Sequence, residues 1–304
     1  VAFVQYNSMG SIGWLSDLPS DILREIQIFH GDIRDAGRVH QSMRGIDAVF
    51  HLAALIGIPY SYQAPQSYID TNVVGTLNAL EGAKAEGIDL FVQTSTSEVY
   101  GTAQFTPMSE LHPIVGQSPY SASKIGADQL AYSYFSSFNL PVVTLRPFNV
   151  FGPRQSSRAV IPTIIRQALS DQPSIVLGNT HATRDMNYVD NTVEAFIKVL
   201  VSADAFGQII NIGSGEERSI ESIASDVLRI TGKDATILSS QKRLRPQNSE
   251  VERLVADSSR AKELLDWGTH NPGFVSFEEG LRRSIEWLAR NLDYEDSSPL
   301  DYRV

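Results

Sequence analysis

Tyr120 and Lys124 have the types and the spacing that suit proton transfer. They stand four positions apart in SPYSASK, so a helix would place both side chains on one face. An ammonium group beside a phenol lowers the pKa of the phenol and makes it usable as a base near neutral pH. The same spacing occurs in ordinary surface pairs, but here it follows a strand that ends in Ser and Thr. We therefore expect Tyr120 to act as a general base.

Glu98 is a second candidate for acid–base chemistry. It lies in STSEVYG, just after the apolar run LFVQ, at the expected end of a buried strand. Burying an unpaired carboxylate is costly unless its pKa shifts, a cation pairs with it, or it faces a ligand. Two interpretations stay open from the residues alone: a structural pair with a nearby cation, or a group that exchanges protons with a substrate.

Alternating strands and helices are expected to position these residues. Strands are predicted at VAFVQY, IQIFHGD, AVFHLAA, LFVQTS and VVTLRPF, and helices at residues 35–43, TNVVGTLNALEGAKAEG and residues 119–138. Runs such as VVTL, apolar on both faces, are typical of a parallel sheet covered by helices on each side. The sequence therefore predicts an α/β fold with a doubly wound parallel sheet.

The pattern loosens after residue 152, where a smaller mixed α/β part is expected. Its helices are predicted at IPTIIRQALS, NTVEAFIKVLVS, residues 220–231 and residues 277–291, and its strands at SIVLG and IINIG. We expect residues 1–152 with 186–213 to form the doubly wound lobe. Residues 153–185 with 214–304 would form a substrate lobe. The acidic end DYEDSSPLDYRV is expected to be a solvated tail.

The composition limits the classes of partner. The chain has 304 residues, a net charge of -10 and no cysteine. The acidic balance argues against nucleic acid or an anionic membrane as a broad electrostatic partner, and the lack of cysteine excludes disulfides and thiolate metal sites. No apolar run approaches the ~20 residues of a spanning helix. We expect a soluble, cytoplasmic protein without a metal site.

The motifs GDIRD, HLAA, TNVVGT, STSEVYG, YSASK, RPFNVFGPR and RDMNYVD follow one another along nearly the whole chain. In this combination the chain resembles the extended short-chain dehydrogenase/reductases that act on nucleotide sugars with NAD, on a Rossmann-type fold. The resemblance implies that Tyr120 takes the sugar hydroxyl proton while hydride passes to the nicotinamide. It also implies that Lys124 holds the nicotinamide ribose and that Thr96 hydrogen-bonds the same sugar hydroxyl.

Glu98 indicates a branch of that family. The 4-epimerases typically carry small or apolar residues at this position, whereas 4,6-dehydratases keep a carboxylate that takes the C5 proton. STSE resembles the GDP-mannose 4,6-dehydratase pattern, while dTDP-glucose dehydratases have STDE. The proton donor to the leaving water therefore stays open between Glu98, Ser97 and a bound water. UDP-glucuronate decarboxylases also resemble the chain at STSEVYG.

The finer resemblance concerns the substrate. The segments YNSMGSIGWLSDLP, GTAQFTP, QSPYSASKIGADQ and RPQNSEVERL look most like UDP-N-acetylglucosamine 4,6-dehydratases of the legionaminic-acid type, which supply precursors of bacterial surface polysaccharides. A GDP-linked sugar is the alternative substrate. A 4-epimerase, a UDP-glucuronate decarboxylase and a non-catalytic nucleotide-sensing module on the same fold are the alternative functions.

The resemblance also assigns binding residues. For the substrate these are Asn149 at the hexose, Arg158 and Val160 near the base and phosphates, and Arg184 and Arg245 as diphosphate clamps. For the cofactor they are Asp32 and Ile33 at the adenine and Leu52, Ala53 and Ala54 at the inner ribose, together with Tyr120 and Lys124. His51 is expected to be a packed histidine at a strand end.

The Gly-rich strand–turn–helix that holds a dinucleotide pyrophosphate is not found near Val1. We therefore expect that a first βα unit is missing ahead of the first strand and that this chain binds NAD weakly. Tyr6, Asn7 or Ser8 would meet the adenosine ribose in place of the usual acid. The helices NVVGTLNALEGA and YSASKIGADQLAYSYF are apolar beyond one face, which predicts a homodimer through these helices.

Overall fold

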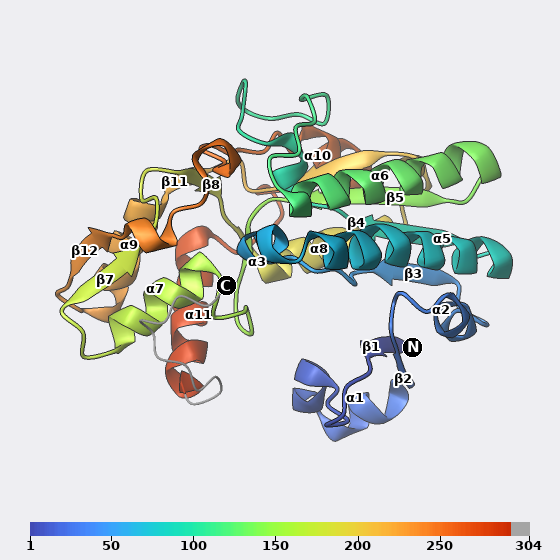
Figure 1. The fold of residues 1–304 in the computed structure, drawn as a ribbon, viewed down its shortest axis with the longest axis horizontal. Coiled ribbons are helices and arrows are strands. Elements are labelled where there is room, and N and C mark those ends of the chain that lie inside the picture. Colours follow the sequence, from blue (N-terminus) through green and yellow to red (C-terminus); the bar gives the residue numbers. More distant parts are fainter. Residues whose placement is uncertain (293–304) are drawn as a thin grey trace.

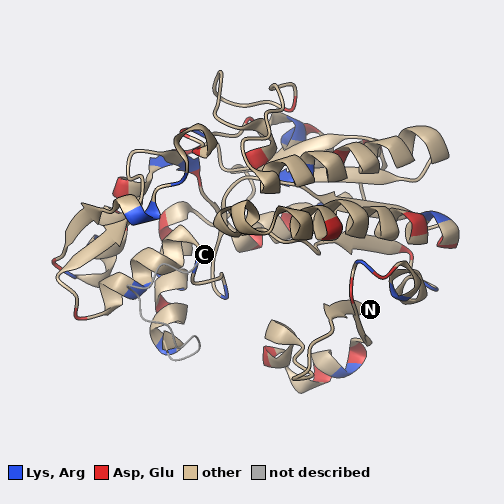
Figure 2. Ribbon diagram, in the orientation of Figure 1, with Lys and Arg blue, Asp and Glu red and all other residues tan. Residues whose placement is uncertain are grey.

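The computed structural model describes residues 1–292 and has two parts (Figure 1). The larger part is built around parallel strands covered by helices, and the smaller part combines short strands with three packed helices. The expected acidic tail, 293–304, lies outside the described residues. Acidic and basic residues are interspersed over both parts, so the acidic excess is not confined to one element (Figure 2).

A four-stranded parallel sheet forms the centre of the larger part and confirms the predicted sheet type. Its order is β10 (Ile209–Ile212), β5 (Val142–Pro147), β4 (Leu90–Thr94) and β3 (Ala48–His51). Successive side chains of a strand point to opposite faces. Val92 therefore packs toward α8 (Val189–Val199) and α10 (Ser259–Leu265), and Phe91 packs toward α5 (Gly75–Glu86) and α6 (Pro119–Phe138). The sheet is covered on both faces, as in a doubly wound fold.

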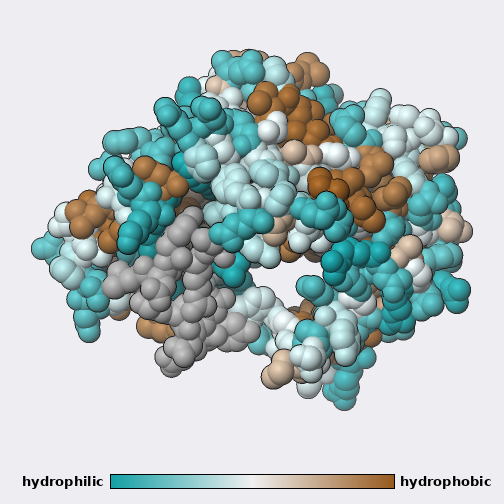
Figure 3. Space-filling view, viewed as in Figure 1, coloured by the Kyte–Doolittle hydropathy of each residue, from teal (hydrophilic) through white to brown (hydrophobic). Residues whose placement is uncertain are grey.

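The first two predicted strands form a separate parallel pair. β1 (Ala2–Gln5) pairs only with β2 (Ile28–Gly31), so within residues 1–292 one edge of β1 and one edge of β3 have no strand partner. The space-filling view shows an opening between this N-terminal part and the rest of the molecule (Figure 3). The loop after β1 reaches the smaller part, where the Trp14 ring meets Trp287 edge-on with centroids 5.5 Å apart.

The remaining helices connect the strands or build the smaller part. They are α1 (Ser20–Glu25), α2 (Ala36–Ser42), α3 (Ile58–Gln63), α4 (Pro65–Tyr68), the π-helix η2 (Ile69–Val74), α7 (Val160–Leu169), α9 (Ile220–Thr231) and α11 (Phe277–Arg290). Short 3-10 helices are η1 (Gly13–Asp17), η3 (Ser97–Tyr100), η4 (Ala203–Ala205), η5 (Gln241–Arg243) and η6 (Gln247–Ser249). Within residues 1–292, no helix combines the length and the apolar character needed to cross a bilayer.

The smaller part has its own apolar core. α7, α9 and α11 pack against strand β7 (Ser174–Leu177) through residues such as Ile164, Ile175, Val227 and Leu281. The other short strands are β6 (Val150–Phe151), β8 (Thr183–Asp185), β9 (Asn187–Tyr188), β11 (Glu217–Ser219) and β12 (Thr236–Ser239). β8 pairs with β11, and β12 pairs with β7. Among them, β8 contains Arg184, one of the residues predicted to bind the substrate.

Local sequence explains where α6 begins and ends. The Ser118 side chain accepts a hydrogen bond from the Ser121 backbone N–H (3.1 Å), and the Ser121 hydroxyl interacts in return with the Ser118 N–H, which completes a capping box. Pro119 occupies the first turn, and Asn139 ends the helix in the left-handed conformation. Tyr120 therefore lies in the first, capped turn of the longest described helix.

Replacing Ser118 with Ala should lower the free energy of unfolding by about 1 kcal/mol, because the Ser121 N–H then loses its acceptor. Urea unfolding followed by circular dichroism measures this change. Ser133→Ala is the matched control, since Ser133 lies inside the same helix and its hydroxyl only returns to the Leu130 carbonyl. Equal losses in the two variants would show that the cap does not fix the start of α6.

Candidate functional site

The end of β4 and the start of α6 bring the predicted catalytic residues together. Tyr120 and Lys124 are buried, with 7% and 4% of their surface exposed. Lys124 Nζ donates a hydrogen bond to the Thr94 carbonyl (2.6 Å). The Thr96 side chain hydrogen-bonds with Tyr120. The expected grouping of Thr96, Tyr120 and Lys124 is thus present in the structure.

Glu98 lies in the short helix η3, which begins directly after Thr96. The Thr96 hydroxyl accepts a hydrogen bond from the Glu98 backbone N–H (3.2 Å) and so caps this helix. Glu98 is 8% exposed, and Ser97 beside it is fully buried. Within residues 1–292, no cation lies within salt-bridge distance of the Glu98 carboxylate, although its charge acts on both Tyr120 and Arg184. This arrangement favours a group that faces a ligand over a structural ion pair.

Burial dominates the acid–base properties of the pair. It raises the pKa of Tyr120, and the charges of Glu98 and Asp128 and the neighbouring Tyr68 raise it further, while the hydrogen bond with Thr96 opposes this rise. Burial also lowers the pKa of Lys124, against the opposing effect of Asp128. In the protein alone the expected lowering of the Tyr120 pKa is therefore not found, because desolvation of the phenolate dominates and raises it.

Tyr68 is a neighbour of Tyr120 that the sequence did not single out. The two rings meet edge-on with centroids 6.2 Å apart, and the Tyr68 hydroxyl donates to the Gly57 carbonyl. Burial raises the pKa of Tyr68, so the Tyr68 side chain stays uncharged where it borders the site. Its segment, SYQAPQSYID, has no regular apolar period that would have pointed to this contact.

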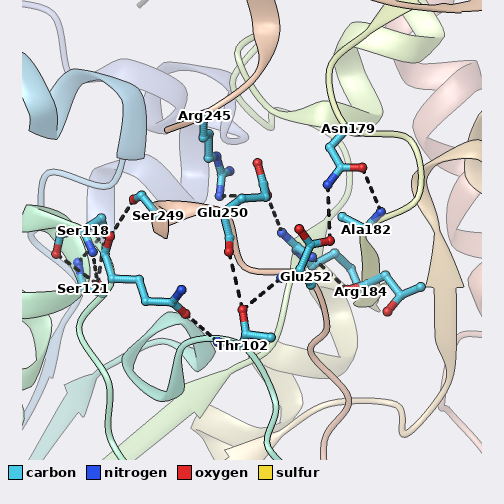
Figure 4. Close-up of polar contacts among 12 residues, drawn as sticks. Thr102, Ser118, Ser121, Asn179, Ala182, Arg184, Arg245, Ser249, Glu250 and Glu252 are labelled. Atoms are coloured by element: carbon cyan, nitrogen blue, oxygen red, sulfur yellow. Dashed lines mark hydrogen bonds and ion pairs between the residues drawn. The ribbon is translucent and has the colours of Figure 1, made fainter. Parts of the chain in front are cut away.

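Arg184 and Arg245 converge on one carboxylate, that of Glu250 (Figure 4). Arg184 Nη2 lies 3.4 Å and Arg245 Nη1 lies 3.8 Å from Glu250 Oε1. The buried Arg245 Nη1 atom has no hydrogen-bond partner within residues 1–292. Glu98, Glu250 and Glu252 all act on Arg184, and Arg245 opposes them. Guanidinium groups suit a diphosphate because each can donate two hydrogen bonds to phosphate oxygens.

The segment that carries these residues is tied to the loop ahead of α6. The Ser249 hydroxyl donates to the Gln117 carbonyl (2.5 Å) and interacts with the Tyr62 hydroxyl (2.6 Å). Thr102 Oγ1 donates to the Glu250 carbonyl (3.4 Å) and accepts from the Glu252 N–H (3.1 Å). Figure 4 shows this chain of contacts between the arginine cluster and Ser118, the cap of α6. These contacts could not be predicted from the sequence, because their partners lie more than 130 positions apart.

Of the other residues predicted to bind substrate, two lie near the site and one packs into a core. Asn149 follows β5, and its buried Oδ1 atom has no hydrogen-bond partner within residues 1–292. Arg158 is exposed, and its charge acts on Tyr68, which borders Tyr120. Val160 begins α7 and packs against the core of the smaller part. Asn149 and Arg158 therefore remain near the site, whereas the Val160 side chain serves packing.

The cofactor residues lie at the carboxyl ends of β2 and β3. Leu52 and Ala53 are exposed and Ala54 is half-buried directly after β3. Asp32 accepts two hydrogen bonds from the Arg34 guanidinium (2.9 and 2.6 Å), which lower its pKa. Ile33 contacts the position where a side chain on Gly75 would point.

Two further expectations concern residues near the cofactor positions. The Asn7 side chain is used within its own loop, where its Oδ1 accepts from the Met9 and Ser11 N–H groups. Its amide is thus committed to the loop rather than directed at a ribose. His51 is a packed histidine, as expected: it is buried, and its Nε2 lies 3.0 Å from Thr76 Oγ1.

The family described as GDP-mannose 4,6 dehydratase matches residues 1–284. The chain is 34% identical over 250 residues to a UDP-glucuronate 4-epimerase from Thermodesulfobacterium geofontis, covering 82% of this chain and 74% of that protein. It is 32% identical over 279 residues to a UDP-N-acetyl-alpha-D-glucosaminuronate decarboxylase from Bacillus cytotoxicus, covering 88% and 84%.

Among solved structures, the fold is similar to that of a dTDP-glucose 4,6-dehydratase from Streptomyces venezuelae with NAD bound. The TM-score is 0.83 at 28% identity, over 97% of this chain and 89% of that one. The related proteins are thus named for an epimerisation, a decarboxylation and a dehydration. All three names refer to a nucleotide sugar, but each refers to a different reaction.

His51 makes stability depend on pH. Burial, followed by the charge of Lys124, lowers the pKa of His51 from 6.5 to about 3. Between these values the unfolded chain binds a proton that the folded protein does not, so stability falls as the pH drops below about 6. His51→Gln should remove about 1 to 2 kcal/mol of the stability loss between pH 7 and pH 5. Urea unfolding at both pH values tests this, with exposed His181→Gln as the control; identical pH dependences in wild type and His51→Gln would contradict it.

Proposed function

Because the chain belongs to the family described as GDP-mannose 4,6 dehydratase, within the extended short-chain dehydrogenase/reductases, we propose that it is an NAD-dependent nucleotide-sugar 4,6-dehydratase. The observation that carries this proposal is Glu98. Its carboxylate is buried beside Tyr120, with no cation of residues 1–292 at salt-bridge distance, where a second base is needed for dehydration. A 4-epimerase has no use for such a base.

The proposed reaction begins at C4 of the hexose. Tyr120 takes the C4 hydroxyl proton, assisted by its hydrogen bond with Thr96, as hydride leaves C4. Glu98 then takes the C5 proton, which is acidic beside the new C4 ketone. Water leaves from C6 with a proton from Glu98, Ser97 or a bound water. Hydride returns to C6 while a proton that has exchanged with solvent is added at C5, and the product is a 4-keto-6-deoxy sugar nucleotide with no net redox change.

NAD, when bound, supplies the hydride acceptor and a cationic ring that favours the phenolate form of Tyr120. The exposed Leu52 and Ala53 at the carboxyl end of β3 fit a cofactor ribose, since ligands of such sheets bind at the carboxyl ends of the strands. Lys124 would hold the nicotinamide ribose, and Asp32 and Ile33 would flank the adenine. The Lys124 ammonium is already directed to this edge by the Thr94 carbonyl.

The proposed substrate is UDP-N-acetylglucosamine. Arg184 and Arg245 would bind its diphosphate and release Glu250, and the unpartnered Asn149 Oδ1 would accept a hydrogen bond from the hexose. The choice of this sugar rests on the segments YNSMGSIGWLSDLP and RPQNSEVERL. The product would be a precursor of bacterial surface polysaccharide. The related 4-epimerase and decarboxylase support those two reactions as the alternatives.

We also propose that the protein forms a homodimer through α5 and α6. Leu77, Tyr132 and Phe138 on these helices are exposed. Hydrophobic surface gathers over α5 and α6 in the space-filling view (Figure 3). Two such helices from each copy would form a four-helix interface. A monomer at micromolar concentration in sedimentation would contradict this proposal.

Proton NMR in deuterated water tests the reaction. With NAD and UDP-N-acetylglucosamine, the protein should produce a C6 methyl signal and deuterium at C5, and Glu98→Gln should reduce methyl formation at least a hundredfold because the C5 base is lost. Glu110→Gln, which changes a buried carboxylate outside the site, is the matched control. Full turnover by Glu98→Gln would exclude Glu98 as the base, and C4 epimerisation without deuterium uptake would make the protein an epimerase.

Arg245→Gln should weaken UDP binding about tenfold, because a charge-assisted hydrogen bond to phosphate contributes about 1.5 to 3 kcal/mol. Isothermal titration at two salt concentrations measures the affinity, and the variant should also show a smaller salt dependence. The control is Lys242→Gln, which removes an exposed positive charge three positions earlier. Equal affinities for the two variants would remove Arg245 from the diphosphate site.

A further inference from the structure

Three consecutive residues at the end of β4 each contact one face of α6. The Thr94 carbonyl accepts from Lys124 Nζ (2.6 Å), the Ser95 hydroxyl donates to Asp128 Oδ2 (2.7 Å), and the Thr96 side chain hydrogen-bonds with Tyr120. Positions 120, 124 and 128 are spaced by four, so they lie in one row along the helix. Asp128 thus extends the row that begins with the two catalytic residues.

Asp128 is locked in place by Arg146 on β5. Asp128 Oδ2 accepts from Arg146 Nε (3.2 Å) and Nη2 (3.0 Å), and the two side chains are 1% and 0% exposed. Arg146 Nη1 also donates to the Tyr100 hydroxyl (3.0 Å), which donates to Asn211 Oδ1 (2.7 Å). The contacts join α6, β5, η3 and β10. A shift of α6 along the sheet would break the contacts that Asp128 makes with Arg146 and Ser95.

The charges that face the catalytic pair come from several elements. Tyr120 is influenced by Glu98 of η3, Tyr68 of α4 and Asp128 of its own helix. Lys124 is influenced by Asp128, which favours its charged form, and it faces His51 of β3, whose lowered pKa of about 3 keeps it neutral. Asp128, although it is the salt-bridge partner of Arg146, is therefore a charge that acts on both Tyr120 and Lys124.

We propose that Asp128, held by Arg146 and Ser95, is a positioning residue for Lys124 and Tyr120: it fixes the register of α6 against β4. The catalytic part of this inference rests on the function proposed above. The effect of Asp128 on Lys124 concerns the protein alone and can be measured without substrate.

Asp128→Asn is the first test. The titration midpoint of Lys124, followed by ¹³Cε lysine NMR and assigned by its loss in Lys124→Arg, should move down by about one pH unit. Loss of Asp128 also removes an anion that raises the pKa of Tyr120, so both limbs of the pH profile of kcat should move to lower pH. We expect kcat to fall at least tenfold while KM for the nucleotide sugar changes less than threefold, since Asp128 is remote from the arginine cluster.

A second variant separates this role from a merely structural one. Asp128→Asn alone leaves Arg146 buried without its anion and destabilises the fold. Adding Arg146→Met removes both buried charges, so the double variant should regain stability and still show the lowered Lys124 midpoint. A double variant with wild-type stability, Lys124 midpoint and pH profile would overturn the proposal. A lowered midpoint in a protein whose wild type converts no nucleotide sugar would support the role of Asp128 and refute only the proposed function.

Discussion

The buried charges at the carboxyl ends of β4 and β5 are the constraint on which the site depends. Glu98, Lys124, Asp128, Arg146 and Arg184 are each less than a tenth exposed. An ionised group in such surroundings must be neutralised by a partner or be compensated by a ligand. Asp128 and Arg146 neutralise each other, and Lys124 uses a backbone carbonyl. Within residues 1–292, Glu98 has no cation at salt-bridge distance, and this asymmetry is the basis for proposing it as the reactive acid.

Two charged clusters share the site and are mechanically connected. The acid–base residues lie on α6 and η3, while the arginine cluster belongs to β8 and the segment around Glu250. The contacts of Gln117, Ser249 and Thr102 join the second cluster to the loop that leads into α6. A diphosphate bound as proposed by the arginines would thereby be set at a fixed distance from the phenol. Binding and chemistry are positioned by the same hydrogen-bonded loop.

The sequence predicts those parts of the fold that depend on local periodicity and capping. Residues 119–138 and 220–231 are helical as expected, since their caps and apolar spacing are local signals. The parallel sheet follows from its doubly apolar strands. Tyr68, Arg146 and Glu250 could not be placed in the site, because their contacts join segments distant in sequence. The raised pKa of Tyr120 was also missed, since desolvation depends on the packing around the ring and not on the YxxxK spacing.

Because β1 and β2 pair separately from the main sheet, β1 and β3 each have an edge without a strand partner within residues 1–292. The exposed backbone edges of β1 and β3 present rows of N–H and C=O groups, and the sequences AFVQ and AVFH contain no lysine, glutamate or proline that would discourage another strand. Such edges are templates for intermolecular strand pairing. Within residues 1–292, the unpaired edges of β1 and β3 are therefore the positions at which this structure offers main-chain hydrogen bonds to a further strand, from the same chain or from another molecule.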